Sequence, residues 1–131
     1  MTVASAQAAV LQVSIAGIRS DQGTLYICVF TAPGAFPACS DQPAARSRRL
    51  KPVAGTIRTT FDDVPAGPCA ISVMHDENDN GKLDTNLIGI PREGVGVSMN
   101  PPPRRGPPRF EDAAFTLTPQ GGTVTVNMVY P

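Results

Sequence analysis

Proline and glycine recur along this chain so often that a long helix has little room to form. The 131 residues include 14 prolines and 12 glycines, spread over most of the sequence. Proline removes a helical hydrogen bond and clashes with the preceding turn, and glycine loses the most backbone freedom on folding. We therefore expect extended segments joined by turns, with little or no helix.

Apolar and polar residues alternate with a period of two in several segments between these turns, which is typical of β-strands that bury one face. Residues 62–67 form a turn between two strands, and residues 119–122 carry the glycines of a hairpin. The sequence predicts an all-β fold, an antiparallel Greek-key β-sandwich of about seven strands. The clearest strands are 11–15, 25–30, 57–61, 69–73, 113–117 and 124–130.

The length of the chain fits one domain. We place that domain at residues 9–131 and interpret residues 1–8 as the disordered remnant of a signal sequence or of a cloning start. No apolar stretch approaches the roughly 20 residues that a membrane helix needs, so we expect no transmembrane segment.

The charges of the chain are balanced, with 11 basic and 11 acidic residues. No overall positive field therefore favours nucleic acid as a partner. The single basic run is interpreted as a solvated loop. It consists of Arg46, Arg48, Arg49 and Lys51.

Residues 76–84 alternate oxygen donors and then supply a glycine, in the manner of a calcium loop. Ca²⁺ takes about six to eight oxygens, and helix-flanked loops provide them from alternating positions and from an acid at the twelfth. Leu87 occupies that twelfth position and cannot close the sphere, so another acid or water must. The predicted Ca²⁺ ligands are Asp76, Asn78, Asn80, Lys82 through its carbonyl, and Asp84.

A turn without metal is the alternative for this segment, because Asn-Gly is a strong hairpin signal and asparagine and aspartate favour turns. Four of the 11 acidic residues nevertheless fall between positions 76 and 84. Like charges so close together repel unless something neutralises them. A cation would do so, and a solvated loop in salt would also suffice.

Three cysteines bear on the compartment of the protein. Cys28 and Cys39 flank a short loop rich in proline and glycine. A disulfide closing a loop of about 12 residues would contribute roughly 3 kcal/mol by chain entropy, and Cys69 would be left over as a thiol. The alternative is three reduced, buried cysteines in a cytosolic protein.

Residues 89–109 hold six prolines and four glycines and no periodic apolar face. A loop of this length is uncommon in a compact domain and is often functional. We expect either a flap over one end of the sandwich or a binding element. The strand at 25–30 also carries an apolar outer face, Tyr26, Cys28 and Phe30, which the flap, an apolar small molecule or a protein partner could cover.

Catalytic signals are weak. His75, the single histidine, shares the inward face of its strand, where a hydrogen-bonded structural role is expected, while Asp76 turns outward. Ser98 lies in a segment that lacks the final glycine of a nucleophile elbow, so a hydrolase using Ser98 and His75 is the least favoured alternative. The residues considered for ligand contact are Tyr26, Phe30, His75, Glu93, Ser98 and Phe110.

Four runs of this sequence, 61–67, 70–84, 87–96 and 106–115, resemble the bacterial family known as domain of unknown function 2141. The resemblance covers nearly the whole chain and implies an exported protein without assigned activity. It also implies a disulfide between Cys28 and Cys39, since many relatives carry that pair. Cys69 and Val97 stand where relatives usually have aromatic residues. A more distant resemblance to transthyretin-like and Cna-B-like modules supports a sandwich and says little about function.

The prediction from the sequence is thus a periplasmic or secreted, non-enzymatic β-sandwich with a Ca²⁺-binding loop at residues 76–84. The alternative is a carrier of an apolar small molecule, such as a lipid or pigment, or a protein-interaction module.

Overall fold

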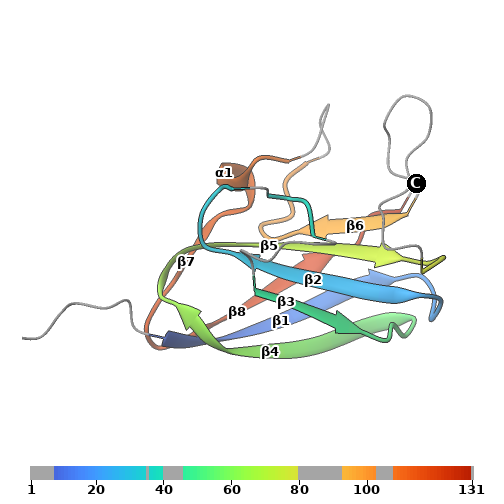
Figure 1. The fold of residues 1–131 in the computed structure, drawn as a ribbon, viewed down its shortest axis with the longest axis horizontal. Coiled ribbons are helices and arrows are strands. Elements are labelled where there is room, and N and C mark those ends of the chain that lie inside the picture. The colour runs from blue at the N-terminus through green and yellow to red at the C-terminus, as the bar shows by residue number, and fades with distance from the viewer. Residues whose placement is uncertain (1–7, 35, 40–45, 80–92, 103–107, 131) are drawn as a thin grey trace, which may run out of the picture.

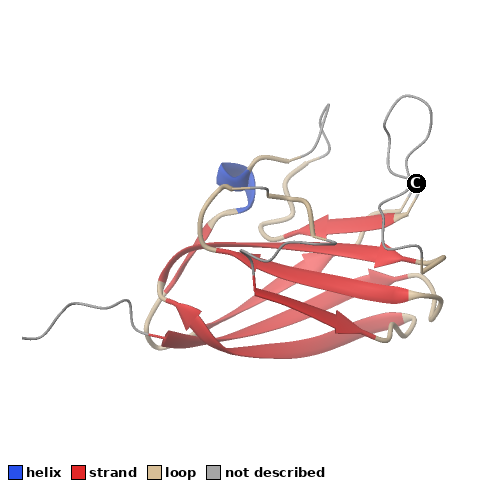
Figure 2. Cartoon of the chain, in the orientation of Figure 1, coloured by secondary structure: helices blue, strands red, loops and turns tan. Residues whose placement is uncertain are grey.

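The computed structural model describes residues 8–34, 36–39, 46–79, 93–102 and 108–130. These residues form two β-sheets packed face to face, with one short helix beside them (Figures 1 and 2). The predicted all-β sandwich is confirmed. Its elements are β1 (Ala8–Ile18), β2 (Thr24–Phe30), β3 (Arg46–Leu50), β4 (Gly55–Pro65), β5 (Gly67–Asp76), β6 (Gly94–Val97), α1 (Phe110–Ala113), β7 (Phe115–Leu117) and β8 (Gly122–Asn127).

The strands are divided between a small and a large sheet. The small sheet has the order β4-β1-β8, and the large sheet has the order β3-β2-β5-β6, with β7 pairing the start of β5. The chain therefore changes sheet at the β1–β2, β3–β4, β4–β5 and β7–β8 connections. Among the described residues α1 is the one helix and has four residues, so none there is long and apolar enough to cross a membrane.

Both turns expected from the sequence connect strands of different sheets. β4 continues to Pro65 and β5 begins at Gly67, so the predicted turn at 62–67 is almost entirely strand. The hairpin predicted at 119–122 is wrong, because β7 pairs with β5 whereas β8 pairs with β1. Gly121 instead passes against β1, where an added Cβ would lie 2.7 Å from the Val10 carbonyl oxygen.

One strand pair is parallel, which corrects the expectation of a wholly antiparallel sandwich. β8 runs parallel to β1, from the Leu11–Gly122 pair to the Ala16–Asn127 pair. The reason is the crossover from β7, which brings the chain into the small sheet at the end where β1 also starts. All the other strand pairs between described residues are antiparallel.

The core lies between the sheets and consists of the alternating apolar residues that the sequence indicated. Each is at most 4% exposed, and their removal from water is the main stabilising contribution. They are Leu11, Val13, Ile15, Leu25, Ile27, Val29, Phe61, Cys69, Ile71, Val73, Leu117 and Val126.

Two strands lie where loops were predicted. The basic run at 46–51, expected as a solvated loop, forms β3 at the edge of the large sheet, because its residues pair with β2 from Val29–Arg46 to Leu25–Leu50. The long segment 89–109 contains β6, whose inward positions are Gly94 and Gly96. A Cβ on Gly94 would lie 2.3 Å from the Tyr130 ring, so these glycines let the C-terminal segment pack against β6.

The C-terminal segment joins the two sheets on one side of the sandwich. Beyond β8, the Met128 N–H still donates to the Ala16 carbonyl of β1. Val129 then exchanges two backbone hydrogen bonds with Val95 of β6. The small and large sheets are thus linked through β6 and β8, and the opposite side is bordered by β3 and β4.

Candidate functional site

His75 and Asp76 end β5 and mark the end of the sandwich where the sequence placed its candidate metal loop. Both residues are completely buried. His75 has the expected hydrogen-bonded position, since its ring nitrogens lie 2.7 Å from the Tyr130 hydroxyl and 2.7 Å from the Gln22 carbonyl. All the hydrogen-bonding capacity of the ring is therefore used inside the protein.

Asp76 lies on the face of β5 opposite His75, as alternation requires, but it is buried rather than turned to solvent. The cause is the β1–β2 turn, which packs onto the end of β5. A Cβ on Gly23 would lie 1.9 Å from the Asp76 carbonyl oxygen, and Gly23 adopts φ +73°, so this close approach needs glycine. The expectation of an outward, exposed Asp76 is corrected.

The neighbouring acid Glu77 is held by the β1–β2 turn. Its carboxylate pairs with the Arg19 guanidinium and accepts a hydrogen bond from the Ser20 hydroxyl at 2.9 Å. The Arg19 hydrogen bond, with support from Ser20, holds the pKa of Glu77 below its usual value. Part of the negative charge of the loop is thus neutralised by Arg19, which lies 58 residues away and belongs to no local motif.

Asp79 and Glu93 are also held by hydrogen bonds. The Thr24 hydroxyl donates to Asp79 at 2.7 Å, and Asp79 adopts a left-handed backbone with φ 55°. The Glu77 backbone N–H donates to Glu93 Oε2 at 2.8 Å, and Glu93 is 6% exposed. Glu93 therefore brings a second nearly buried carboxylate next to the start of the loop.

The predicted Ca²⁺ ligands are only partly covered by the structure. Asp76 and Asn78 are described, whereas Asn80, Lys82 and Asp84 lie outside the described residues. Within the described part of the chain, no three side chains of histidine, cysteine, aspartate or glutamate come together in a group that could hold a metal.

The apolar outer face of β2 is covered by the chain itself. Cys28 and Phe30 are buried beneath Phe36 and Phe110, and the ring of Phe36 meets those of Phe30 and Phe110 edge to face at 5.2 and 5.9 Å. The cover comes from the loop after β2 and from α1. The described part of 89–109 contributes instead the strand β6 and residues near it.

The Cys28–Cys39 disulfide expected from the family resemblance is present, with the Cα atoms 5.6 Å apart. It fixes the loop after β2 onto the large sheet, where the Ser72 hydroxyl donates to the Pro37 carbonyl at 2.7 Å. Cys69 is a free, buried thiol, and burial raises its pKa to about 11. The thiol and the disulfide lie in different apolar clusters, on opposite faces of the large sheet.

Ser98 and His75 are not brought together. Ser98 is opposite Ile71 of β5, whereas His75 is opposite Gly94, so about four residues, or roughly 13 Å of strand, separate them. The Ser98 hydroxyl donates to the Ala113 carbonyl at 2.6 Å and accepts from the Ile71 N–H at 2.9 Å. Ser98 is completely buried, and its hydroxyl joins β5, β6 and α1.

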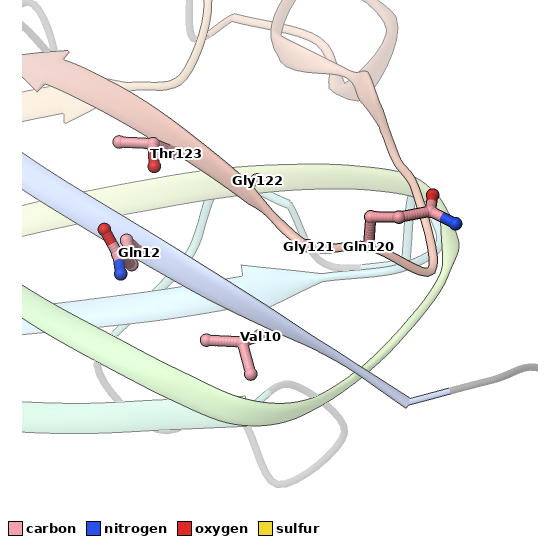
Figure 3. A pocket seen from close by; sticks show the side chains of 6 residues that line it. All are labelled: Val10, Gln12, Gln120, Gly121, Gly122 and Thr123. Carbon is pink, nitrogen blue, oxygen red and sulfur yellow. The ribbon is translucent and has the colours of Figure 1, made fainter.

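A surface hollow lies on the small sheet, between the start of β1 and the start of β8 (Figure 3). Its lining contains no ionisable side chain, so it offers neither an acid nor a base for catalysis. The lining residues are Val10, Gln12, Gln120, Gly121, Gly122 and Thr123.

Comparison with curated proteins and with solved structures gives no match. A family model described as an uncharacterised protein conserved in bacteria matches residues 13–126. This match extends from the middle of β1 almost to the end of β8 and includes every other strand. The chain belongs to this bacterial family, domain of unknown function 2141.

Proposed function

We propose that this protein is an exported, non-enzymatic β-sandwich module whose loop at 76–84 binds Ca²⁺. The observation that carries the proposal is the completely buried Asp76 at the end of β5, at the head of a segment with oxygen donors at alternate positions. A buried carboxylate keeps its charge where hydrogen bonds, ion pairs or a bound cation stabilise it, so a cation can act together with protein partners at such a site. Ca²⁺ selects carboxylate, amide and carbonyl oxygens of this kind.

Glu93 supports the proposal, because the loop lacks an acid at its twelfth position. Its carboxylate accepts a hydrogen bond from the Glu77 N–H and therefore lies beside the first residues of the loop. Arg19 and Thr24 engage Glu77 and Asp79 and orient these two acids toward the β1–β2 turn and the start of β2. Asp76 and Glu93 are the acids of the described residues that we assign to the metal.

Export is supported by the Cys28–Cys39 disulfide, since disulfides persist mainly in the periplasm and outside the cell. A periplasmic or secreted module meets calcium at higher concentrations than a cytosolic protein does. With few carboxylates, the dissociation constant should fall at about 10⁻⁴ to 10⁻³ M, the range of extracellular modules.

Calcium titration of chelator-treated protein by calorimetry tests the proposal. We expect binding in the stated range and a rise in melting temperature, because a ligand that binds the folded state stabilises it. Asp76→Asn should abolish both effects. Asp62→Asn, which removes an exposed acid on β4, is the matched control and should leave them unchanged. The absence of heat and of any shift at about 10⁻² M free calcium would refute the site.

A carrier of an apolar small molecule, or a module that binds a protein through the same face, remains the second candidate. The observation that favours this second candidate is the aromatic cluster over the disulfide, in which Tyr26, Phe36 and Phe110 are only partly buried. A bound lipid or pigment would have to displace Phe36 or Phe110. Native purification followed by mass spectrometry and an absorption spectrum tests it, and recovery of the protein without a bound molecule would leave calcium binding as the function.

A further inference from the structure

We propose that the open edge of β3 binds an acidic segment of a partner protein in extended conformation, adding it as a further strand to the large sheet. This site is separate from the calcium loop and does not depend on it. Addition of a strand to a sheet edge is a common mode of peptide recognition, in which backbone hydrogen bonds give affinity and side chains give specificity.

The chain itself contacts the edges of β6, β8 and β4. β6 pairs with Val129. The edge of β8 is occupied by Asn100, whose amide nitrogen donates to the Thr125 carbonyl at 3.0 Å and whose amide oxygen accepts from the Asn127 N–H at 2.8 Å. At β4, the Arg48 guanidinium donates to the Thr60 carbonyl and to the Thr59 hydroxyl.

β3 differs from these three edges. It pairs with β2 on one side, and no described residue forms a backbone hydrogen bond with it on the other side. Arg46, Ser47 and Arg49 are exposed. A strand edge of this kind presents N–H and C=O groups that another extended chain can pair.

Four of the 11 basic residues of the chain lie on β3 or immediately after it. Arg48 is stacked over the Phe61 ring at 4.5 Å and Arg49 over the Tyr26 ring at 5.1 Å, which holds both guanidinium groups beside the edge. No carboxylate forms an ion pair with this group within the described residues. Its members are Arg46, Arg48, Arg49 and Lys51.

The positive charge of β3 and the backbone groups at its open edge together indicate which kind of partner can bind there. A second copy of β3 would place arginines opposite arginines, and like charges directly across a strand pair are destabilising. Phosphate groups of lipids or nucleic acids accept hydrogen bonds but donate none, so they leave the carbonyls of the edge unpaired. An acidic extended peptide satisfies the donors, the acceptors and the positive charge together.

The probe is a synthetic peptide of about seven residues in which glutamate and valine alternate, a typical strand length. It is titrated into isotope-labelled protein while amide chemical shifts are recorded. We expect shifts centred on residues 46–50, with binding that weakens as salt is raised. A peptide with lysine in place of glutamate should not bind. The glutamate peptide with alternate backbone nitrogens methylated should bind at least about tenfold more weakly, since it lacks the ladder donors.

Arg46→Glu tests the charge on the edge itself. Arg46 is exposed and forms no ion pair with the described residues, so the variant should fold and lose about tenfold in affinity, as repulsion replaces attraction. Arg58→Glu is the matched control, with the same change in net charge on the outer face of β4. It should change affinity by less than about twofold, because solvent and salt screen the interaction between residue 58 and a peptide at the edge of β3.

Four results would overturn the proposal. These are no binding at millimolar peptide, equal binding of the methylated peptide, equal losses in the two variants, and shifts that map away from β3. Binding to vesicles of anionic phosphatidylglycerol that is lost in Arg46→Glu, without peptide binding, would assign the cluster to a lipid surface instead. The peptide controls need no protein variant, so the conclusion does not depend on the folding of Arg46→Glu.

Discussion

Tyr130 and His75 meet at one end of the sandwich, where the Tyr130 hydroxyl lies 2.7 Å from Nδ1 of His75. The other ring nitrogen, Nε2, lies 2.7 Å from the Gln22 carbonyl oxygen, which can only accept. Nε2 therefore donates to Gln22, and in the neutral imidazole Nδ1 accepts from the Tyr130 hydroxyl. Tyr130 also accepts from the Arg19 backbone N–H at 3.2 Å. This hydroxyl thus connects the C-terminal segment, the β1–β2 turn and the end of β5.

Tyr130→Phe should therefore destabilise the protein by about 1 to 3 kcal/mol, because it leaves a buried ring nitrogen without its donor. Chemical denaturation at neutral pH measures the change in the free energy of unfolding. Tyr26→Phe is the matched control, since no described residue hydrogen-bonds its hydroxyl, and it should stay within about 0.5 kcal/mol of the wild type. Equal effects of the two substitutions would contradict the role assigned to the Tyr130 hydroxyl.

Ser98→Ala should also destabilise the protein, by about 2 kcal/mol. The substitution removes the hydroxyl that satisfies two buried backbone groups, the Ala113 carbonyl and the Ile71 N–H. Thermal or chemical denaturation measures the loss, with Ser47→Ala on the exposed face of β3 as the control. A fully stable Ser98→Ala protein would show that Ser98 is not the structural link inferred from its hydrogen bonds.

The strands of the core could be predicted from the sequence because their inward positions carry Leu, Ile and Val at every second residue. β6 could not, since its inward positions are Gly94 and Gly96 and its apolar neighbours come from the C-terminal segment. The pairing of β8 with β1 was also missed, because local turn residues do not determine which sheet the next strand joins. A hairpin signal at 119–122 therefore gave the wrong partner.

The candidate site also has one part that the sequence predicts and another that only the fold reveals. Acid clustering after β5 is visible in the sequence, whereas the partners of those acids are not. Arg19 and Thr24 reach Glu77 and Asp79 only because the β1–β2 turn packs onto the end of β5. Contacts between residues more than 50 positions apart depend on the fold and have no local pattern. Crowded negative charge in the sequence therefore does not by itself distinguish a bound cation from protein partners that neutralise the acids.

Gly96→Ala should destabilise the protein by about 1 to 3 kcal/mol through overpacking. The new Cβ would lie 2.7 Å from Val126 Cγ1 and 3.0 Å from the Asn127 carbonyl oxygen, and the backbone atom cannot rotate away. The double variant Gly96→Ala/Val126→Ala separates the two contacts. Gly96→Ala should lower the free energy of unfolding by less in the Val126→Ala background than in the wild type, because the clash with the Val126 methyl group is gone. It should still lower it, because the contact with the Asn127 carbonyl oxygen remains. A cost of zero in the Val126→Ala background would mean that the Asn127 backbone is not a constraint.

Cys69 should make the protein less stable as the pH rises from about 9 to about 11. Burial raises the pKa of this thiol from 9.0 to about 11, and Arg46 opposes part of that effect. Below pH 9 the thiol is protonated in both the folded and the unfolded chain, so it contributes no pH dependence. Above pH 9 the unfolded chain loses this proton while the folded chain keeps it, which favours unfolding until the pH passes the folded value.

Denaturant unfolding of the wild type and of Cys69→Ala at a series of pH values measures this contribution. Burial also raises the pKa of Tyr130, so both proteins should lose stability at high pH. The wild type should lose more, and the two curves should converge toward high pH. Parallel curves would show that the thiol ionises equally in both states. Alkylation of the folded protein at about pH 8 gives an independent reading, because a buried thiol with a raised pKa presents little thiolate and should react only after denaturation.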